Sequence, residues 1–248
     1  MQLPLFLQGA LAVTEKNIRI YYTKPPVFIF GLLFPLFLFI AFFMGRGLDL
    51  ASFYPGFLAM TLFFTASSVG PIITPWEKRD RTYERLLSYP LTVESIILGD
   101  ILAGALFGFA ISLVIWAGSL LILTLPVGNL LLIGAAFVLG TATFATLGTL
   151  LASPASDTPS TVMMLSTLVR LPLIFISGIF IPLADLGGTA QAVAFLSPLT
   201  YLVDLFQGAM NGAGVIGPVT DLVALFMFIL LFGAGAVYFQ RRNLIRGL

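Results

Sequence analysis

The stretch ILAGALFGFAISLVIWAGSLLILTLPVGNLLLIGAAFVLGTATFATLGTLLASPAS, residues 101–156, contains no Asp, Glu, Lys or Arg. A helix needs roughly 20 apolar residues to cross a hydrocarbon core about 30 Å thick, so this stretch is too long for a single crossing. Within it, LPVGN at residues 125–129 places Pro and Gly where a tight turn is needed. The stretch therefore predicts two consecutive membrane spans, at residues 95–124 and 130–152.

The composition of the whole chain agrees with a membrane protein. Of its 248 residues, 59% are hydrophobic and 9% are charged, and the mean hydropathy is +1.06. A chain this poor in polar residues cannot cover a core with the polar surface that water requires. The absence of Cys and His removes thiolate and imidazole chemistry, and with it most metal sites and general bases. With a net charge of +1 and no long basic stretch, we expect no nucleic-acid partner.

Apolar stretches on either side of residues 101–156 predict four more spans, at residues 25–45, 54–76, 162–182 and 222–240; only the third of these contains a charged residue. Between the last two, residues 183–219 are apolar but interrupted by Gly and Pro. Two short external re-entrant helices, at residues 190–195 and 199–210, are one interpretation, and a folded external cap is the other. The predicted fold is an all-α integral membrane protein with six transmembrane helices in a single domain, residues 1–248.

The distribution of Lys and Arg predicts the orientation, because basic residues resist translocation across the membrane. With the N-terminus in the cytoplasm, only Arg46 falls outside. The basic residues on the cytoplasmic side are then Lys16, Arg19, Lys24, Lys78, Arg79, Arg81, Arg85, Arg241, Arg242 and Arg246. The sequence therefore predicts that both termini are cytoplasmic and that the loop at residues 77–90, between the second and third spans, is cytoplasmic too.

This loop gathers seven charged side chains into the nine positions EKRDRTYER, residues 77–85. The apolar positions near it are spaced i, i+3, i+4, as on one face of a helix: Tyr83, Leu86 and Leu87. We expect Asp80 to be the N-cap of this helix and Pro90 to end it. Charges of both signs around an apolar face favour docking into a groove on another protein. A solvated loop whose charges only set the topology is the alternative.

EKRDRTYERLLSYPLT, residues 77–92, also resembles a signature of the type 2 family of ATP-binding-cassette (ABC) exporter permeases. In that family a pattern E-x-x-x-G-T-x-E-x-L-x-x-T-P forms the cytoplasmic coupling helix between the second and third spans. The matching residues are Glu77, Thr82, Glu84, Leu86 and Pro90. Arg81 stands where Gly is usual, which bears on the bend that enters the helix, and Tyr89 stands where Thr is common.

Other stretches extend the resemblance along the chain. TEKNIRIYYTKPPVFIFGLLFPLFLFIAFF, residues 14–43, resembles the amphipathic N-terminal interfacial helix of the family, here within residues 1–24, leading into the first span. SGIFIPLADL, residues 177–186, and LSPLTYLVDLFQGAM, residues 196–210, resemble the exit of the fifth span and the external re-entrant helices. Gln207 replaces the Arg often found in the second of these stretches.

The resemblance implies a permease subunit that pairs with a second copy, as a homodimer, and binds two cytoplasmic ABC ATPase subunits, in the cell membrane of a bacterium or archaeon. The chain has no G-x-x-x-x-G-K-[ST] motif, so we expect no enzymatic activity and no cofactor on it, with ATP and Mg on the partner. The expected ATPase-contacting residues are Glu77, Arg79, Asp80, Arg81, Tyr83, Glu84, Arg85, Leu86 and Leu87. A second contact, or simple anchoring to membrane lipid, is expected at Glu15, Lys16 and Arg19.

Arg170 is the one basic residue well inside a predicted span. An unpaired Arg at the bilayer centre costs about 2.5 to 3.5 kcal/mol, so it should face protein or water. A role in the substrate route, or in attracting an anionic headgroup, and a purely structural pairing or snorkelling role are both open.

The alternative function is a secondary transporter that works without an ATPase. Such a protein is expected to show repeated halves and ion-coupling acids at mid-membrane, and neither is evident in the sequence. Asp185 and Asp204, near the predicted outer face, are expected to be helix caps or solvated ends.

Overall fold

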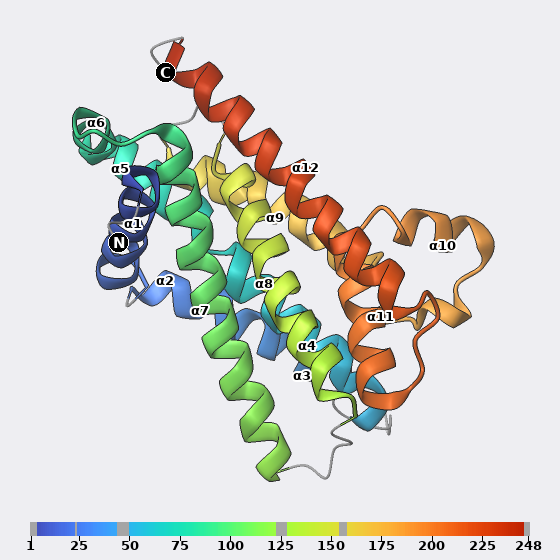
Figure 1. The fold of residues 1–248 in the computed structure, drawn as a ribbon. Coiled ribbons are helices and arrows are strands. Elements are labelled where there is room, and N and C mark those ends of the chain that lie inside the picture. Colours follow the sequence, from blue (N-terminus) through green and yellow to red (C-terminus); the bar gives the residue numbers. More distant parts are fainter. Residues whose placement is uncertain (1–3, 23, 44–49, 123–127, 154–157, 246–248) are drawn as a thin grey trace.

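The computed structural model describes residues 4–22, 24–43, 50–122, 128–153 and 158–245, and the regular elements within them are all helices (Figure 1). In chain order they are α1 (Leu5–Ile20), α2 (Pro25–Phe28), η1 (Ile29–Leu33), α3 (Phe34–Phe43), α4 (Leu50–Ser67), α5 (Gly70–Arg79), α6 (Thr82–Ser88), α7 (Val93–Ile122), α8 (Leu130–Leu151), α9 (Pro159–Phe175), η2 (Leu183–Asp185), α10 (Gly188–Ala194), α11 (Pro198–Asn211) and α12 (Pro218–Ile245). Arg46, Arg246 and positions 125–127 of the predicted turn lie outside the described residues.

Within the described ranges, four helical segments are long and apolar enough to cross a membrane: Ser52–Arg79, Val93–Leu121, Leu130–Leu151 and Pro218–Asn243. They coincide with the predicted second, third, fourth and sixth spans. The helix at the predicted fifth span, α9, has 17 residues, and the first predicted span is divided among α2, a π-helical turn and α3. Helices α10 and α11 meet at a bend of 100° and add a fifth crossing only if they count as one span. By length and composition the described helices thus support four or five crossings, and the full set of six predicted spans is not confirmed.

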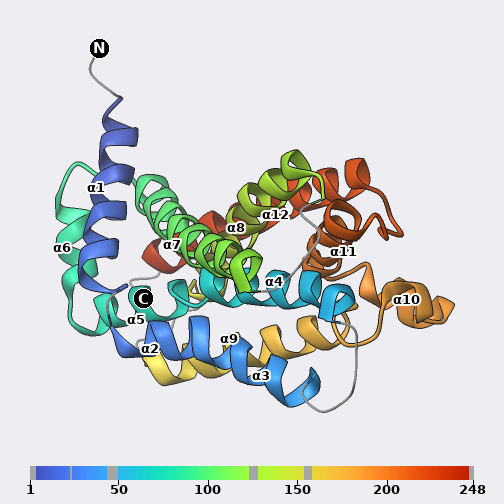
Figure 2. The ribbon, with the colours of Figure 1, turned by 90° about the horizontal axis from the view of Figure 1, so that it is seen from below.

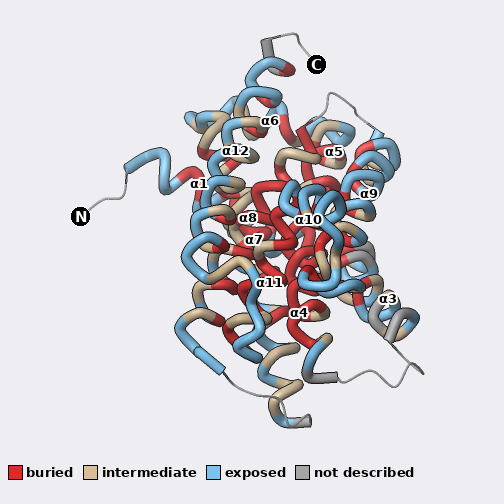
Figure 3. Tube along the Cα trace, turned by 90° about the vertical axis from the view of Figure 1, so that its right-hand side faces the viewer, coloured by how far each residue is buried: buried red, intermediate tan, exposed pale blue. Residues whose placement is uncertain are grey.

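The segment formed by α4 and α5 is the centre of the bundle. Of its apolar window, 94% is buried, against 22% for α7 and 11% for α12. In Figure 2 this segment runs between α2, α3 and α9 on one side and α7, α8, α11 and α12 on the other. Figure 3 shows the buried residues concentrated along it. The helix that leads into the charged loop is therefore held on both sides.

The break between α4 and α5 follows from the sequence. Pro71 has no N–H to donate to the carbonyl of Ser67, four residues earlier, so the helical ladder is interrupted there. The hydroxyl of Ser67 donates to the carbonyl of Phe63 at 2.6 Å, and that of Ser68 donates to the carbonyl of Phe64. Hydroxyls bonded back to the preceding turn bend helices, so Pro71 and these serines together account for the kink.

Glycines let the neighbouring helices approach this kink closely. A Cβ added at Gly148 of α8 would lie 2.7 Å from the carbonyl oxygen of Ser67, and one added at Gly70 would lie 2.7 Å from the carbonyl of Gly148. On α7, a Cβ at Gly108 would lie 2.7 Å from the Cβ of Ala66. Small residues at helix crossings bring backbones together in membrane proteins. The crossing of α8 over the kink is consequently a backbone-to-backbone contact.

We predict that Gly148→Ala destabilises the protein by about 1–3 kcal/mol, because the added methyl meets backbone that no side-chain rotation can relieve. The measurement is the thermal unfolding midpoint in mild detergent. Gly134→Ala, on the same helix with nothing within 4 Å of its added Cβ, is the control and should keep or raise the midpoint because Ala favours helix over Gly. Equal midpoints for the two variants would contradict the close crossing.

Candidate functional site

Helix α5 turns into α6 at the end of the bundle that also holds α1 (Figure 1). Asp80 closes α5, its N–H bonding to the carbonyl of Trp76 at 2.9 Å, and Arg81 follows in the left-handed region with φ 55° and ψ 21°. The prediction that Asp80 is the N-cap of α6 is therefore wrong. The chain must reverse direction before Thr82, and the left-handed residue that ends α5 takes the cap position.

The left-handed backbone at Arg81 explains why Gly is usual at this position in the family that the sequence resembles. Among the described residues, Arg81 is the only non-glycine with a positive φ. A residue with a Cβ pays roughly 1–2 kcal/mol in this region, whereas Gly enters it freely. The side chain of Thr82 spans the same corner, its hydroxyl donating to the carbonyl of Glu77 at 3.3 Å. The bend is thus kept although the favoured residue is absent.

The side chains at this corner divide into an outer and an inner set. A charged rim, defined by its exposed members, faces away from the bundle: Arg79, Asp80, Arg81, Glu84 and Arg85. Within the rim, the Nε of Arg79 lies 3.0 Å from the Oδ1 of Asp80, and an exposed pair of this kind contributes little to stability. The rim is therefore free to exchange its partners.

Tyr83 and Glu77 belong to the inner set, although both are among the expected partner-contacting residues. Tyr83 is 6% exposed and packs with Val13 of α1 and Ile96 of α7, while Glu77 is 3% exposed. Leu86 and Leu87 are partly buried against the same cluster. In this conformation the apolar face of α6 is occupied by the chain's own helices, and the charged rim is the part open to another molecule.

Glu77 is buried with an opposite charge beside it. Its Oε1 forms an ion pair with the Nζ of Lys16 on α1, and the hydroxyl of Tyr21 lies within hydrogen-bonding reach of the same carboxylate. Burial raises the pKa of Tyr21, as does the negative charge of Glu77, so the phenol stays protonated as a donor. A buried carboxylate without such partners would be costly. Lys16 and Glu77 thus bind α1 to the end of α5.

A second polar contact joins α1 to α7. The amide of Asn17 donates to the Oδ1 of Asp100 at 2.7 Å, and the hydroxyl of Tyr83 donates to the Oε1 of Gln240 on α12 at 3.5 Å. Burial raises the pKa of Tyr83, helped by the negative charges of Asp100 and Glu77, so this hydroxyl remains a donor too. Neither Asp100 nor Gln240 was expected at the site. The sequence did hold one signal for Asp100, because an acidic residue stands at the sixth position of the predicted span 95–124.

The three residues expected to form a second contact on α1 also divide into exposed and inward-facing side chains. Glu15 and Arg19 are exposed and pair with each other at 2.7 Å, whereas Lys16 faces Glu77. Apolar side chains on α1 are also exposed, Leu5 by 65% and Leu11 by 50%. Between α1 and the end of α6 runs a groove of about 600 Å³, lined by Leu5, Gln8, Gly9, Ala12, Val13, Lys16, Leu86, Tyr89, Pro90 and Leu91.

Arg170 lies against the kink between α4 and α5, away from the corner. It is 6% exposed, its NH2 group donates to the hydroxyl of Ser166, and NH1 reaches the hydroxyl of Ser68 at 3.5 Å. No carboxylate pairs with it in the part of the chain that the structure describes. Arg170 is thus held by hydroxyls at the kink. Among the described residues, no group of three or more acidic side chains could hold a metal ion.

We predict that Arg81→Gly stabilises the protein by about 1 kcal/mol, because Gly adopts a positive φ without steric cost. The thermal unfolding midpoint of the purified chain measures it. Arg85→Gly, which also removes one positive charge but lies in the middle of α6, is the matched control. It should lower the midpoint because Gly has a low helix propensity. A lower midpoint for both variants would contradict the left-handed assignment of Arg81.

Removing the partner of Lys16 should destabilise the chain. We expect Glu77→Gln to cost about 1–3 kcal/mol, less than the loss of a fully buried pair, since the Lys16 side chain is 22% exposed. The exchanged pair Lys16→Glu with Glu77→Lys should recover part of the loss, as measured by unfolding midpoints in a double-mutant cycle. Arg19→Gln, in the exposed pair, should change little. Additive single losses, with no recovery in the exchanged pair, would disprove the coupling.

Comparison with known proteins identifies the family. A family model described as ABC-2 type transporter matches residues 8–211. The chain is 29% identical over 263 aligned positions to Nodulation protein J of Neorhizobium galegae, covering 98% of this chain and 96% of that protein. It is 28% identical over 155 residues to the Inner membrane transport permease YadH of Escherichia coli K12, covering 62% of this chain and 60% of that protein's length. The resemblance drawn from the sequence is confirmed: the chain belongs to the ABC-2 type transporter family, whose members are transmembrane subunits of ABC transporters.

Proposed function

We propose that this chain is the permease subunit of an ABC exporter, and that a separate ATPase subunit docks on the charged rim of the α5–α6 corner. The observation that carries the proposal is the position of the rim: exposed charges of both signs stand at the end of the most buried helical segment of the bundle. Charges of both signs orient a docking partner and fix its register. The rim would therefore select the ATPase, while the buried segment behind it receives the force.

The inner residues explain how force on α6 would reach the bundle. Tyr83 packs α6 against α1 and α7, and the ion pair of Lys16 and Glu77 binds α1 to α5. A push on the rim therefore cannot move α6 alone. It displaces α1, α5 and the start of α7 together, and α5 passes it to the kink with α4. In this proposal Glu77 and Tyr83 transmit the motion, and Arg79, Asp80, Arg81, Glu84 and Arg85 contact the ATPase.

The rest of the assembly is proposed from the family and the predicted topology. ATP and Mg would bind on two ATPase subunits, and a second copy of this chain would complete the substrate route as a homodimer. Six spans, with α2 to α3 and α9 as the shorter ones, would place both termini in the cytoplasm of a bacterium or archaeon. One observation supports a common side for the termini and the corner: α1 and the end of α12 lie at the same end of the bundle as α6 (Figure 1). The name of YadH, an inner membrane permease, supports the membrane location alone.

Helix α11 favours the re-entrant interpretation of residues 183–219 over an external cap. Its side chains Leu199, Leu202 and Phe206 are 0% exposed and belong to the main core cluster. A cap resting on the surface would not contribute to the core in this way. We propose that α11 enters the bundle from the outer side and that α10, whose residues are mostly exposed, stays near the surface.

The test is recovery of the ATPase subunit with the tagged permease. Proteins that copurify from the native host in mild detergent are identified by mass spectrometry. We expect an ABC ATPase with the unaltered chain and at least a tenfold loss of it with Glu84→Arg combined with Arg85→Glu. The unfolding midpoint of this variant should not change, because both side chains are exposed.

Asp185→Arg, an exposed charge reversal on η2, is the matched control and should keep the ATPase. Two results would contradict the proposal: equal recovery from the rim variant, or a chain that purifies without any ATPase and transports in vesicles without ATP. The second result would support the secondary-transporter alternative.

A further inference from the structure

The loop before α12 is folded around the carboxylate of Asp204, at the end of the bundle opposite α6. Its Oδ1 accepts from the N–H of Val215 at 2.8 Å, and its Oδ2 accepts from Ile216 at 2.9 Å and Gly217 at 3.4 Å. Through these three hydrogen bonds the carboxylate of Asp204, on α11, fixes the loop that leads into α12.

Asp221, in the first turn of α12, lies beside this carboxylate without any donor of its own. It is 1% exposed, and no hydrogen-bond donor reaches either of its carboxylate oxygens. Its side chain is nevertheless within hydrogen-bonding reach of Asp204. Two carboxylates in contact repel when both are charged, and an ionised carboxylate without donors is costly to bury. With both carboxylates ionised, the pair would lack one neutralising positive charge.

Among the residues that the structure describes, no cationic side chain pairs with Asp204 or Asp221. Both side chains line a cavity of about 180 Å³, whose other lining residues are all Leu, Gly, Ala or Pro. Tyr201 of α11 is the titratable group near Asp221, but its hydroxyl donates to the carbonyl of Phe195 at 3.0 Å. A cation from solution can supply this charge.

We propose that Asp204 and Asp221 form a proton-binding site, in which a protonated Asp221 donates its O–H to the carboxylate of Asp204. One proton satisfies both observations at once: Asp221 gains the hydrogen bond it lacks, and Asp204 keeps its three backbone donors. A metal ion fits less well, because hard cations such as Ca²⁺ take six to eight oxygen ligands and no third acidic side chain joins the pair among the described residues. The shared proton thus ties α11 to α12.

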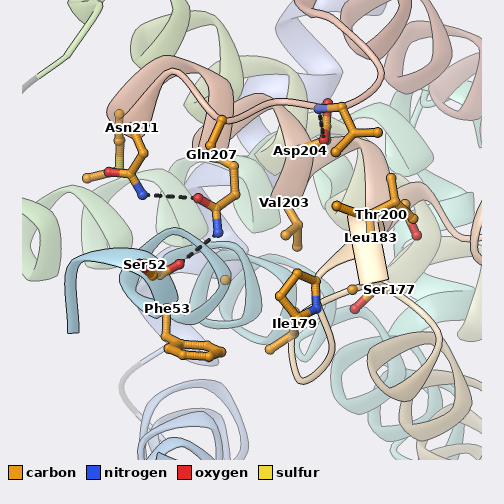
Figure 4. A pocket seen from close by; sticks show the side chains of 17 residues that line it. Ser52, Phe53, Ser177, Ile179, Leu183, Thr200, Val203, Asp204, Gln207 and Asn211 are labelled. Atoms are coloured by element: carbon orange, nitrogen blue, oxygen red, sulfur yellow. Dashed lines mark hydrogen bonds between the residues drawn. The ribbon is translucent and has the colours of Figure 1, made fainter. Parts of the chain in front are cut away.

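The site also borders a larger cavity of about 570 Å³ between the start of α4, residues 177–184 and α11 (Figure 4). Asp204 and Val215 both line it. On its other side Gln207 donates to the carbonyl of Ser52 at 2.7 Å and Asn211 donates to Gln207 at 3.0 Å. Loss of the proton would place two negative charges in contact and loosen the loop that forms this edge. The shape of the cavity mouth would then depend on pH.

Infrared spectroscopy tests the proton directly. The purified chain, in a detergent without ester groups, should show at pH 7 the C=O stretching band of a buried carboxylic acid, shifted in ²H₂O. Asp221→Asn should remove this band. Asp185→Asn, at an exposed acid, should leave it. A spectrum in which Asp221→Asn removes no acid band would overturn the proposal.

Thermal unfolding gives an independent readout. Between pH 6 and pH 10 the midpoint of the unaltered chain and of Asp185→Asn should fall several degrees further than that of Asp221→Asn, because the amide of Asn donates to Asp204 at either pH. Parallel pH profiles would overturn the proposal. A midpoint raised by millimolar CaCl₂ in the unaltered chain but not in Asp221→Asn would also overturn it, in favour of a metal cation.

Discussion

The backbone contact between α8 and the kink of α4 and α5 is the constraint on which the rest of the structure depends. In a bilayer, helices gain little from hydrophobic association with one another, so close backbone approach and local polar contacts decide how they pack. Gly148 and Gly70 allow the two segments to meet at the point where Pro71 has opened the helical ladder. With this crossing fixed, α5 can leave the bundle in only one direction, and the corner with α6 has a defined position.

The charged residues at the α5–α6 corner lie on two different surfaces, one facing the bundle and one facing away from it. Glu77 and Lys16 face inward and hold α1 to the corner, while Arg79 to Arg81 and the α6 charges face outward. Read as a sequence, EKRDRTYER looks like one cluster with one role. The structure separates it because α5 and α6 point in different directions, so that residues a few positions apart have opposite environments. In the proposed docking, contact with the partner would therefore depend on inner residues that the partner need not touch.

This division shows what the sequence could and could not predict. The charge-free stretches predicted the long helices, and the i, i+3, i+4 spacing predicted a short helix that ends before Pro90, as found for α6. The N-cap was misplaced because Asp is a good cap and Arg in the left-handed region is rare; only the glycine of the family pattern hinted at the turn. The burial of Tyr83 against α1 and α7 could not be predicted, because periodicity identifies an apolar face but not what covers it. Asn17, Asp100 and Gln240 come from distant helices, and their meeting is tertiary information.

The two ends of the molecule meet the cost of buried charge in different ways. At the α6 end, Lys16 and Glu77 have opposite charges, so each supplies the counter-charge of the other. At the other end, Asp204 and Asp221 have like charges, and the proposed proton makes that contact conditional. A helix such as α12, with Gln240 near the corner and Asp221 at the opposite end, is thus fixed at one end and adjustable at the other. Motion that begins at α6 would be expressed where the holding contact is weakest, at the junction of α11 and α12 beside the larger cavity.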